Sequence, residues 1–326
     1  MKKIDKQLVL KTLQNNPCEN LYFVVESELL CDYEVEKHFE ENNDGFPVER
    51  EDATYWIEKI DWRISTEWLY EDTGWEKYFL KEGPLLVNLR KDSPLIEYYI
   101  KHWTQHRIGI FIQSDADIDE MQQHLTSILV MNNETGGDVY FRLQESRQLD
   151  AVLKSLNKYR QAELLGSIQH LIWCKDIGID HQWMHIENPN PTITHGQESP
   201  WFGFTQAENE RLNYYTEVNF KLAVLSHLKH WLTQQQDTPN PLHGKDDEAL
   251  MTQIDEGLSV AAQYGYTSNQ HISRFILAIL GNLLLTQQHA DIIRKAQNPA
   301  IHPNRRINQL EQSIKQQGGL IYGNNK

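Results

Sequence analysis

The sequence changes its hydrophobic period once along its 326 residues, and this change limits the folds that are open to it. Before residue 188, short runs rich in Val, Ile, Leu, Phe or Tyr alternate with helical patterns. After residue 204, apolar residues recur at spacings of three and four, which is typical of amphipathic helices. We therefore predict an α+β fold, in which an N-terminal mixed α/β lobe has a β-sheet flanked by helices and a C-terminal lobe is all-α.

A segment rich in proline marks the predicted domain boundary. Pro189, Pro191, Gly196 and Pro200 fall between the two patterns, and such segments commonly link domains. We assign residues 1–187 to the N-terminal α/β lobe, residues 188–204 to a linker and residues 205–315 to the C-terminal helical lobe. Residues 316–326, which are rich in Gln and Asn, are expected to form a flexible tail.

Short apolar runs in the first lobe predict strands. They are residues 21–25, 85–89, 108–112, 128–131, 139–143 and 171–173. Gly136 and Gly137 lie between the fourth and fifth runs, which indicates a β-hairpin. Because a hairpin occurs beside strand–helix–strand units, the pattern favours an α/β or α+β layer over an all-parallel, doubly wound sheet.

Capping residues predict where several helices begin. The pairs are Ser93 before Pro94, Ser114 with Asp117, Thr205 with Glu208, and Thr267 with Gln270. In each pair a hydroxyl side chain precedes a helical pattern and can accept a hydrogen bond from its first turn. The third pair opens one amphipathic helix of about 28 residues. The fourth opens a helix that is apolar almost all round, which places it centrally in the helical lobe.

The charge of the chain restricts its partners. It carries 31 Lys and Arg against 46 Asp and Glu, a net charge of −15. Nucleic acids and anionic membranes attract basic surfaces, so we expect neither as a partner. Residues 26–52 alone contain eleven acidic and two basic side chains. This block either solvates a surface or docks a basic partner.

Cysteine usage indicates a reducing compartment. The chain has three cysteines, Cys18, Cys31 and Cys174. This number is odd and too small for a disulfide framework. The N-terminal residues do not resemble a secretory leader, because Asp5 and Lys6 interrupt the expected apolar stretch. We therefore expect a cytoplasmic protein.

Catalytic signatures are mostly absent. The sequence lacks the short motifs of phosphate-binding loops, dinucleotide-binding folds, serine hydrolase elbows and zinc hydrolases. Their absence does not exclude an enzyme, but it favours a protein that has no catalytic residues and no cofactor.

Two kinds of residue set resemble metal sites only in part. Asp115, Asp117 and Asp119 imitate half of a calcium loop, but Glu120 and Thr126 stand where that loop needs Gly and a closing Glu. We expect these carboxylates to serve a helix N-terminus instead. Three histidine pairs lack a third ligand, and they are His102 with His106, His181 with His185, and His227 with His230. We therefore expect no metal.

Aromatic residues gather where the linker meets the second lobe. They are Trp201, Phe202, Phe204, Tyr214 and Tyr215. Such rings can anchor a protein partner, because they offer a large contact area at low entropic cost. They more often staple neighbouring elements together. Both interpretations stay open, and the five aromatics with Arg142 form our predicted set of partner-binding residues.

Arg142 also has two interpretations. Its guanidinium could pair with a carboxylate of a partner, or it could form a charge-assisted bond inside the lobe with Asp115 or Glu145. We favour the internal bond, because guanidinium groups commonly serve such pairing.

Several motifs in order resemble a known family. They are Gly-Pro-Leu-Leu-Val at residues 83–87, Gly-Ile-Phe-Ile-Gln-Ser-Asp at 109–115, Val-Tyr-Phe-Arg-Leu at 139–143 and Tyr-Gly-Tyr-Thr-Ser at 264–268. In this order the chain resembles the effector adaptor/chaperones of the bacterial type VI secretion system, the Tap or TEC adaptors. It departs from them at Gln144-Glu145-Ser146, where relatives carry an aromatic-Asp-Pro step, and at Ile108, where Trp is common.

The resemblance implies a cytoplasmic, non-enzymatic adaptor. Similar proteins bind a cognate toxic effector and help load it onto the VgrG spike or the PAAR tip. The alternative is a metal-dependent or acid/base hydrolase with a site near Asp115, His124 and Arg142, which rests only on titratable residues near strand ends. An interaction module with no role in secretion is a third possibility.

Overall fold

The computed structural model of the chain describes residues 1–15, 18–42, 51–71, 73, 80–133, 137–178, 180–191, 200–235, 240–282 and 296–316. The chain divides into two compact units. The first unit comprises Met1–Asp176 and His181–Thr216, and the second comprises Ile177–Asp180 and Glu217–Lys326. The main passage between the units falls inside the long helix α9 (Gln206–Gln234). The linker predicted at 188–204 and the tail predicted at 316–326 stay predictions, and residues 192–199 and 317–326 lie outside the described residues.

A seven-stranded sheet organises the first unit. Its order is β1 (Lys2–Ile4), β9 (Asp180–Glu187), β8 (His170–Ile177), β5 (Gly109–Ser114), β2 (Asn20–Val25), β4 (Leu85–Leu89) and β3 (Ser65–Trp68). The recorded strand pairings are antiparallel, and Phe23 lies opposite both Val87 and Phe111. Together with the helical second unit, this sheet confirms the predicted α+β fold class.

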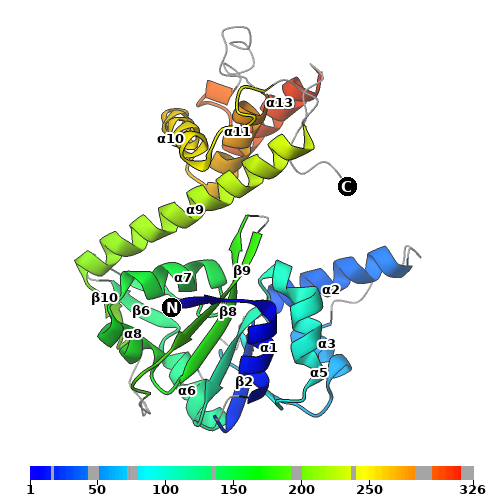
Figure 1. The fold of residues 1–326 in the computed structure, drawn as a ribbon, viewed down its shortest axis with the longest axis vertical. Helices are drawn as coiled ribbons and strands as arrows, with labels where there is room; N and C mark the ends of the chain where they lie inside the picture. The colour runs from blue at the N-terminus through cyan, green and yellow to red at the C-terminus, as the bar shows by residue number, and fades with distance from the viewer. Residues whose placement is uncertain are drawn as a thin grey trace. The chain divides into compact units, whose positions relative to one another are not determined.

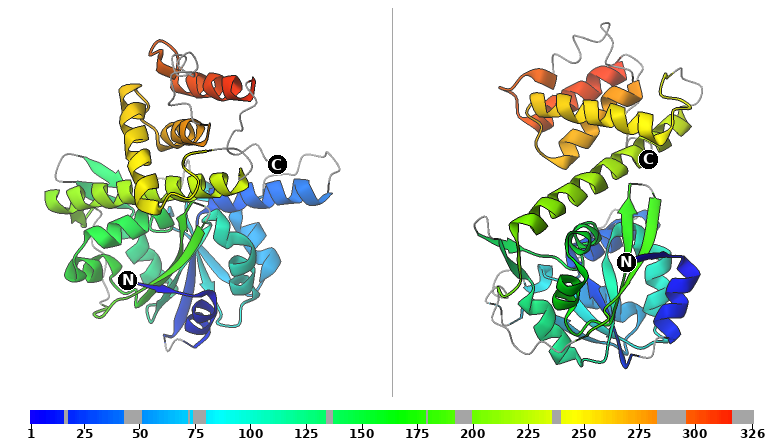
Figure 2. Two further views of the ribbon diagram at one scale, coloured as in Figure 1. Left: turned by 45° about the horizontal axis from the view of Figure 1, so that its top comes forward. Right: turned by 60° about the vertical axis from the view of Figure 1, so that its left-hand side comes forward.

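Apolar side chains leave the central strands on both faces of the sheet. In β2, Leu21, Phe23 and Val25 join one core cluster, whereas Tyr22 and Val24 join another. The alternation follows from the two-residue period of a strand. The first cluster also contains side chains of α1 (Lys6–Asn15), α2 (Ser27–Asn42), α3 (Ala53–Ile60) and α5 (Pro94–Tyr98). The second contains side chains of α6 (Ile118–Ser127), α7 (Ser146–Ser155) and α8 (Lys158–Leu165), so helices cover both faces (Figures 1 and 2).

A small second sheet completes this unit. β6 (Val130–Asn133) pairs antiparallel with β7 (Asp138–Tyr140), and β10 (Gly203–Phe204) pairs with β6 in parallel. The β6–β7 pairing confirms the predicted hairpin. Gly137 has φ +101, a conformation that glycine adopts without steric cost.

The structure confirms the six predicted strands as β2, β4, β5, β6, β7 and β8, with shifted ends at several of them. The prediction missed β1, β3, β9 and β10. Three of these are at most four residues long, and β9 reads Asp-His-Gln-Trp-Met-His-Ile-Glu, in which polar residues mask the apolar run. Their neighbours in the sheets supply the pairing that the local sequence does not signal.

Two predicted helix starts are confirmed by hydrogen bonds. The Ser93 hydroxyl accepts from the Leu95 N–H at 3.3 Å. Thr205 and Glu208 form a reciprocal capping box, in which each side chain accepts from the backbone N–H of the other at 3.3 and 2.9 Å. These contacts satisfy N–H groups that the first turn of a helix leaves unpaired.

Two other predicted starts are wrong in detail. The capping box of α6 is formed by Asp117 and Glu120, not by Ser114 and Asp117. Ser114 instead ends β5 and donates its hydroxyl to the Ser167 carbonyl at 2.7 Å. Helix α11 (Asn269–Asn282) is capped by Ser268 rather than Thr267, because the Ser268 hydroxyl accepts from the N–H three residues later.

The second unit is helical. Side chains from the C-terminal half of α9, from α10 (Asp247–Gln263), from α11 and from α13 (Pro303–Gln316) share one apolar core. Phe275 to Gly281 of α11 are buried in succession, which confirms the central helix predicted there. Gly281 permits the close packing, since an added Cβ would lie 2.3 Å from the Trp231 ring.

Candidate functional site

A buried carboxylate stands at the end of the central strand β2. Glu26 follows Val25 directly, and its N–H donates to the Ile108 carbonyl at 2.6 Å. Its carboxylate accepts from Arg142 Nη1 at 3.3 Å and from Gln144 Nε2 at 2.7 Å. We call Glu26, Arg107, Arg142, Gln144 and Glu145 the Glu26 corner. It joins the end of β2 to the segment between β7 and α7.

Burial raises the pKa of the Glu26 carboxyl, because a charged carboxylate loses its hydration there. The Arg142 charge and the Gln144 hydrogen bond oppose this effect, while the nearby Glu145 and Glu28 add to it. The net direction is upward. A buried group whose pKa is shifted by both burial and specific charges is a typical feature of functional sites.

Arg142 links this buried carboxylate to solvent. Its side chain is 39% exposed, and its guanidinium carbon lies 5.6 Å from the centre of the Tyr140 ring. Within the described part of the chain, Arg142 donates to the Glu26 carboxylate through Nη1. A guanidinium has five N–H donors in a planar fork, so Arg142 can also bind a carboxylate that approaches from outside.

Arg107, another residue of the Glu26 corner, has an unusual backbone conformation. It follows the 3-10 turn η3 (Thr104–His106) and has φ 57, the left-handed region, as no other described residue except glycine does. Its side chain forms an ion pair with Glu145 at 3.5 Å. A non-glycine residue in this region costs on the order of 1–2 kcal/mol, and such strain is concentrated at functional sites.

The structure corrects the predicted partner of Arg142. The guanidinium contacts Glu26, not Asp115 or Glu145. Glu145 instead pairs with Arg107. Asp115 accepts from the Glu19 N–H at 2.9 Å and from Gln169 Nε2 at 2.7 Å. Arg142 therefore forms an internal charge-assisted bond, as we favoured, but its partner is Glu26, which lies 116 residues away in sequence.

The three residues of the predicted hydrolase site do not converge. Arg142 contacts Glu26, which follows Val25. Val25 lies opposite Gly109, at the start of β5, whereas Asp115 follows Ser114, at the end of that strand. Six residues of strand span roughly 17 Å. His124 is buried in the core beside Gly166, and burial lowers its pKa to about 4.

Two of the predicted partner-binding aromatics are core residues. Phe202 and Phe204 are buried in the cluster beneath α6, α7 and α8. Arg160 stacks on Phe202 with its guanidinium carbon 4.1 Å from the ring centre, and it also binds Glu208 and the Gly203 carbonyl. These side chains hold α8 to the start of α9, so they are not presented to a partner.

The other three aromatics are more accessible. Trp201 is half-buried and donates its indole N–H to Ser127 Oγ at 3.0 Å. Tyr215 is half-buried, with Lys154 Nζ 5.9 Å from its ring centre. Tyr214 is exposed. Of the predicted partner-binding set, Tyr214 is therefore the exposed aromatic, and the Arg142 side chain is partly exposed.

No set of three or more metal-ligating side chains gathers within the described ranges. The carboxylate of Asp117 caps α6, as expected for a helix N-terminus. His185 contacts His170 of the neighbouring strand, with Nε2 and Nδ1 3.1 Å apart, rather than His181. This cross-strand pair was not predicted, because β9 was not predicted.

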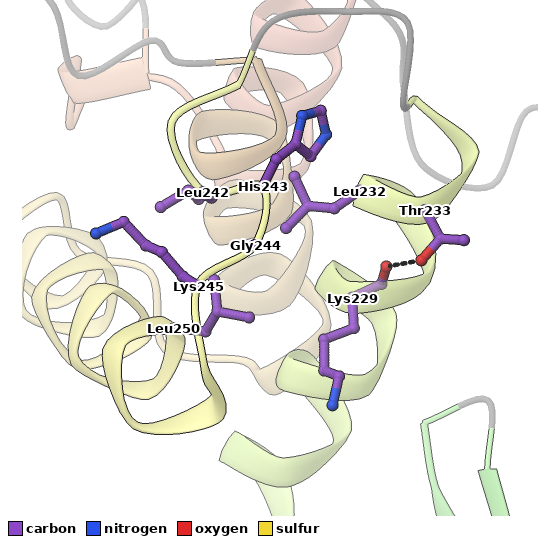
Figure 3. A pocket seen from close by; sticks show the side chains of 8 residues that line it. All are labelled: Lys229, Leu232, Thr233, Leu242, His243, Gly244, Lys245 and Leu250. Carbon is purple, nitrogen blue, oxygen red and sulfur yellow. Dashed lines mark hydrogen bonds between the residues drawn. The ribbon is translucent and has the colours of Figure 1, made fainter.

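A separate pocket of about 340 Å³ lies in the second unit (Figure 3). Leu232, Leu242 and Leu250 provide its apolar lining, and Lys229 and Lys245 also line it. Lys229 is also paired with Asp247 at 2.7 Å. Thr233, His243 and Gly244 complete its lining.

Comparison with known proteins gives one match. Residues 47–163 match the model of a family described as "Domain of unknown function (DUF4123)". The match includes Arg107, Arg142, Gln144 and Glu145 but begins after Glu26. No curated protein and no solved structure matches the chain. Within the described part of the chain, no helix has both the length and the apolar character needed to cross a bilayer.

Proposed function

We propose that the chain is a cytoplasmic, non-enzymatic adaptor that binds a cognate type VI secretion effector and promotes its loading onto the VgrG or PAAR spike. The observation that carries the proposal is the DUF4123 match over residues 47–163. The motifs at residues 83–87, 109–115 and 139–143, which resemble the effector adaptors, fall inside this match. They form β4, β5 and the segment from β7 to the Glu26 corner.

The Glu26 corner supports a binding role. Arg142 is hydrogen-bonded to Glu26 and lies beside the Tyr140 ring, and these contacts orient its guanidinium before a partner binds. Fixed anchors bind more tightly because less side-chain entropy is lost on association. The group that best matches the free side of a guanidinium is a carboxylate. The effector would therefore present an Asp, a Glu or its terminal carboxylate to Arg142.

The separation of Asp115 from Arg142 supports binding rather than catalysis. General acid/base chemistry needs its groups within hydrogen-bond reach of one substrate, and these two lie at opposite ends of a strand. Metal analysis and a broad hydrolase screen on the purified chain test this part of the proposal. A bound metal or turnover would contradict it.

Co-purification with the effector encoded beside the gene tests the proposal directly. We expect the wild-type chain and a Lys158→Ala control to retain the effector, because Lys158 is an exposed cation of the same unit. We expect Arg142→Ala to lose at least about tenfold in affinity, as is common for an anchor residue. Normal effector stability and delivery after deletion of the gene would reject the proposal.

A further inference from the structure

The strand β3 forms one edge of the seven-stranded sheet. Within the described part of the chain it pairs with β4 alone, so its other side is an open edge. An open edge presents backbone N–H and C=O groups that can pair with a strand of another chain. The register with β4 determines which groups these are.

The backbone groups of Ile64 and Thr66 point toward this open edge. The Leu69 N–H donates to the Pro84 carbonyl at 3.0 Å. In an antiparallel ladder, opposed residues that share hydrogen bonds alternate with opposed residues that do not. Counting back from Leu69 in twos, Ser65 bonds to β4, and the residues on either side of it point their N–H and C=O groups away. Within the described ranges, these outward groups have no hydrogen-bond partner.

The other neighbour of β4 gives an independent check of this alternation. The Glu26 N–H donates to the Ile108 carbonyl, next to the last β2–β5 pair. Alternate residues of β2 therefore bond to β5, and Phe23, three residues before Glu26, bonds to β4 instead. Its partner there is Val87, which also lies opposite Thr66. Since the backbone groups of Val87 are directed to β2, those of Thr66 face the open edge.

The two ends of the edge carry opposite charge. At one end, burial raises the pKa of Glu67, and the nearby Glu71 and Asp119 carboxylates add to the effect. At the other end, Arg63 donates to the Asp61 carboxylate from Nε at 2.9 Å and from Nη2 at 3.2 Å. The Arg63 side chain is 34% exposed and that of Asp61 is 1% exposed, so the guanidinium is the group of this pair that meets solvent.

The remaining charges near Arg63 leave its end of the edge positive. Asp92 acts on Arg63 by its charge, but it is itself paired with Arg90 at 3.0 Å. Lys59, in the last turn of α3, adds a positive charge. An antiparallel partner with the same sequence would therefore bring its positive end to the negative end of β3.

The sequence of the edge is complementary to itself. Residues 62–68 read Trp-Arg-Ile-Ser-Thr-Glu-Trp. In an antiparallel pair of two copies centred on Ser65, Ile64 of each copy lies opposite Thr66 of the other. The outward N–H and C=O groups of these residues then form hydrogen bonds on both sides of a twofold axis.

The same register matches the side chains. Glu67 of each copy lies beside Arg63 of the other, and opposite charges on paired strands are stabilising. Trp62, which is 82% exposed, comes beside the half-buried Trp68 of the second copy. Aromatic pairs stabilise a contact beyond the area that they bury. The register thus covers an indole that is left in solvent in the single chain.

Neighbouring registers are less favourable. A pair centred on Glu67 would place two like carboxylates directly opposite each other. A pair centred on Thr66 would use the Trp68 carbonyl, which already accepts from the Glu71 N–H at 3.1 Å and from Gln122 Nε2 at 3.2 Å. The register centred on Ser65 avoids both conflicts.

We propose that the open edge of β3 pairs with the same edge of a second copy of this chain, so that residues 62–68 form the interface of a symmetric dimer. The inference goes beyond the proposed adaptor function and does not depend on it. The net charge of −15 opposes the association of two copies at long range. We therefore expect a reversible dimer with a Kd of about 10–100 μM at about 0.15 M salt, where exposed charges are screened.

Analytical ultracentrifugation of the full-length protein tests the inference. Over roughly 1–300 μM, the wild-type chain should pass from one copy toward two. Glu67→Lys should raise the dimer Kd at least about tenfold, because the new ammonium meets Arg63 of the other copy. Asp138→Lys is the matched control, since Asp138 is exposed outside this edge and the charge change is the same. Both variants lower the net negative charge, so long-range repulsion alone would predict tighter association for both.

A disulfide tests the register. Ser65 is exposed, and at the twofold axis its two copies form a pair without shared hydrogen bonds, in which the Cα atoms lie about 4.5 Å apart. This separation permits a disulfide. Under mild oxidation, Ser65→Cys should form linked dimers at least about tenfold faster than Tyr159→Cys, whose position is 77% exposed on the same unit. Wild type should not be linked, because Cys18, Cys31 and Cys174 are buried.

A wild-type chain that stays monomeric over the whole concentration range would overturn the inference. It would also be overturned if Glu67→Lys dimerised as tightly as wild type or the control, or if Ser65→Cys were linked no faster than Tyr159→Cys. The linking experiment decides the matter if Glu67→Lys does not fold. None of these measurements uses the effector, so a failure of the proposed adaptor function leaves their results unchanged.

Discussion

The Glu26 carboxylate accepts a hydrogen bond from the Gln144 amide at 2.7 Å, although 118 residues separate the two in sequence. Gln144 opens the segment where the chain departs from the aromatic-Asp-Pro step of the adaptors that it resembles. The departure has a structural consequence, because an aromatic side chain would not supply this amide donor to the buried carboxylate. In this chain the corner is built around a polar contact.

The first prediction concerns the protonation of Glu26. Its pKa is raised in the folded state by burial, so the folded chain binds this proton more tightly than the unfolded chain does. Glu26 therefore favours folding below its unfolded pKa, and this advantage is lost as pH rises through its folded pKa. Glu26→Gln removes this dependence, so its free energy of unfolding relative to wild type should increase as pH rises from about 4.5 to about 8. The increase is about 1.4 kcal/mol for each tenfold difference in proton affinity between the folded and unfolded chains. Urea unfolding across this range measures it, and a pH-independent difference would contradict it.

The histidine pair on β8 and β9 should show the opposite dependence. Burial lowers the pKa of both rings. The pKa of His185 falls to about 4, because His170, Lys2 and the terminal amine add to the effect of burial. At His170, the Glu187 carboxylate opposes the lowering. The unfolded chain therefore binds more protons than the folded chain below pH 6.5, and stability falls from there toward pH 4.

His185→Gln should flatten this dependence. Urea unfolding of the variant and of wild type at pH 7 and pH 5 measures the change. A variant that loses as much stability as wild type over this interval would show that the pair does not titrate as described.

Arg107 offers a test of backbone strain that uses two variants. Arg107→Gly and Arg107→Ala both remove the ion pair with Glu145, but only glycine adopts φ 57 without steric cost. We expect the Gly variant to be more stable than the Ala variant by about 1 kcal/mol. Thermal or urea unfolding compares them, and equal stability would show that the position is not strained.

A buried ion pair beneath α7 should be costly to break. Lys175 donates to the buried Asp150 carboxylate at 2.7 Å, and Lys154 contacts the same oxygen at 2.9 Å. Lys175→Met should lower the free energy of unfolding by about 2 kcal/mol, because the buried Asp150 carboxylate then loses one of its two charged donors while Lys154 remains. Adding Asp150→Leu to this variant should restore part of the loss. A double variant less stable than the single one would contradict this explanation.

The strength of local pattern decided how much of the fold the sequence could predict. Residues of β2, β4 and β5 are apolar in succession and were found, whereas β9 and the short edge strands β1 and β3 take their conformation from neighbours in the sheet. The Thr205–Glu208 box was found because its two residues are local. Ser114 was misassigned because its hydroxyl bonds to Ser167, a contact distant in sequence.

The candidate site was only partly predictable for the same reason. Arg142 was identified as important, but Glu26 was hidden in the acidic block of residues 26–52, since its burial depends on Arg142 and Gln144. Its position directly after an apolar strand was the available signal. The open edge of β3 offered no signal, because the strand was not predicted and its outward groups follow from the pairing with β4.

Affinity capture from the native host, followed by mass spectrometry, tests the central claim most directly. Wild-type chain should enrich the effector encoded beside its gene, and Arg142→Ala should recover much less of it while remaining folded. Capture that enriches no secreted effector, or that enriches one equally with both proteins, would contradict the account of an adaptor that binds through the Glu26 corner.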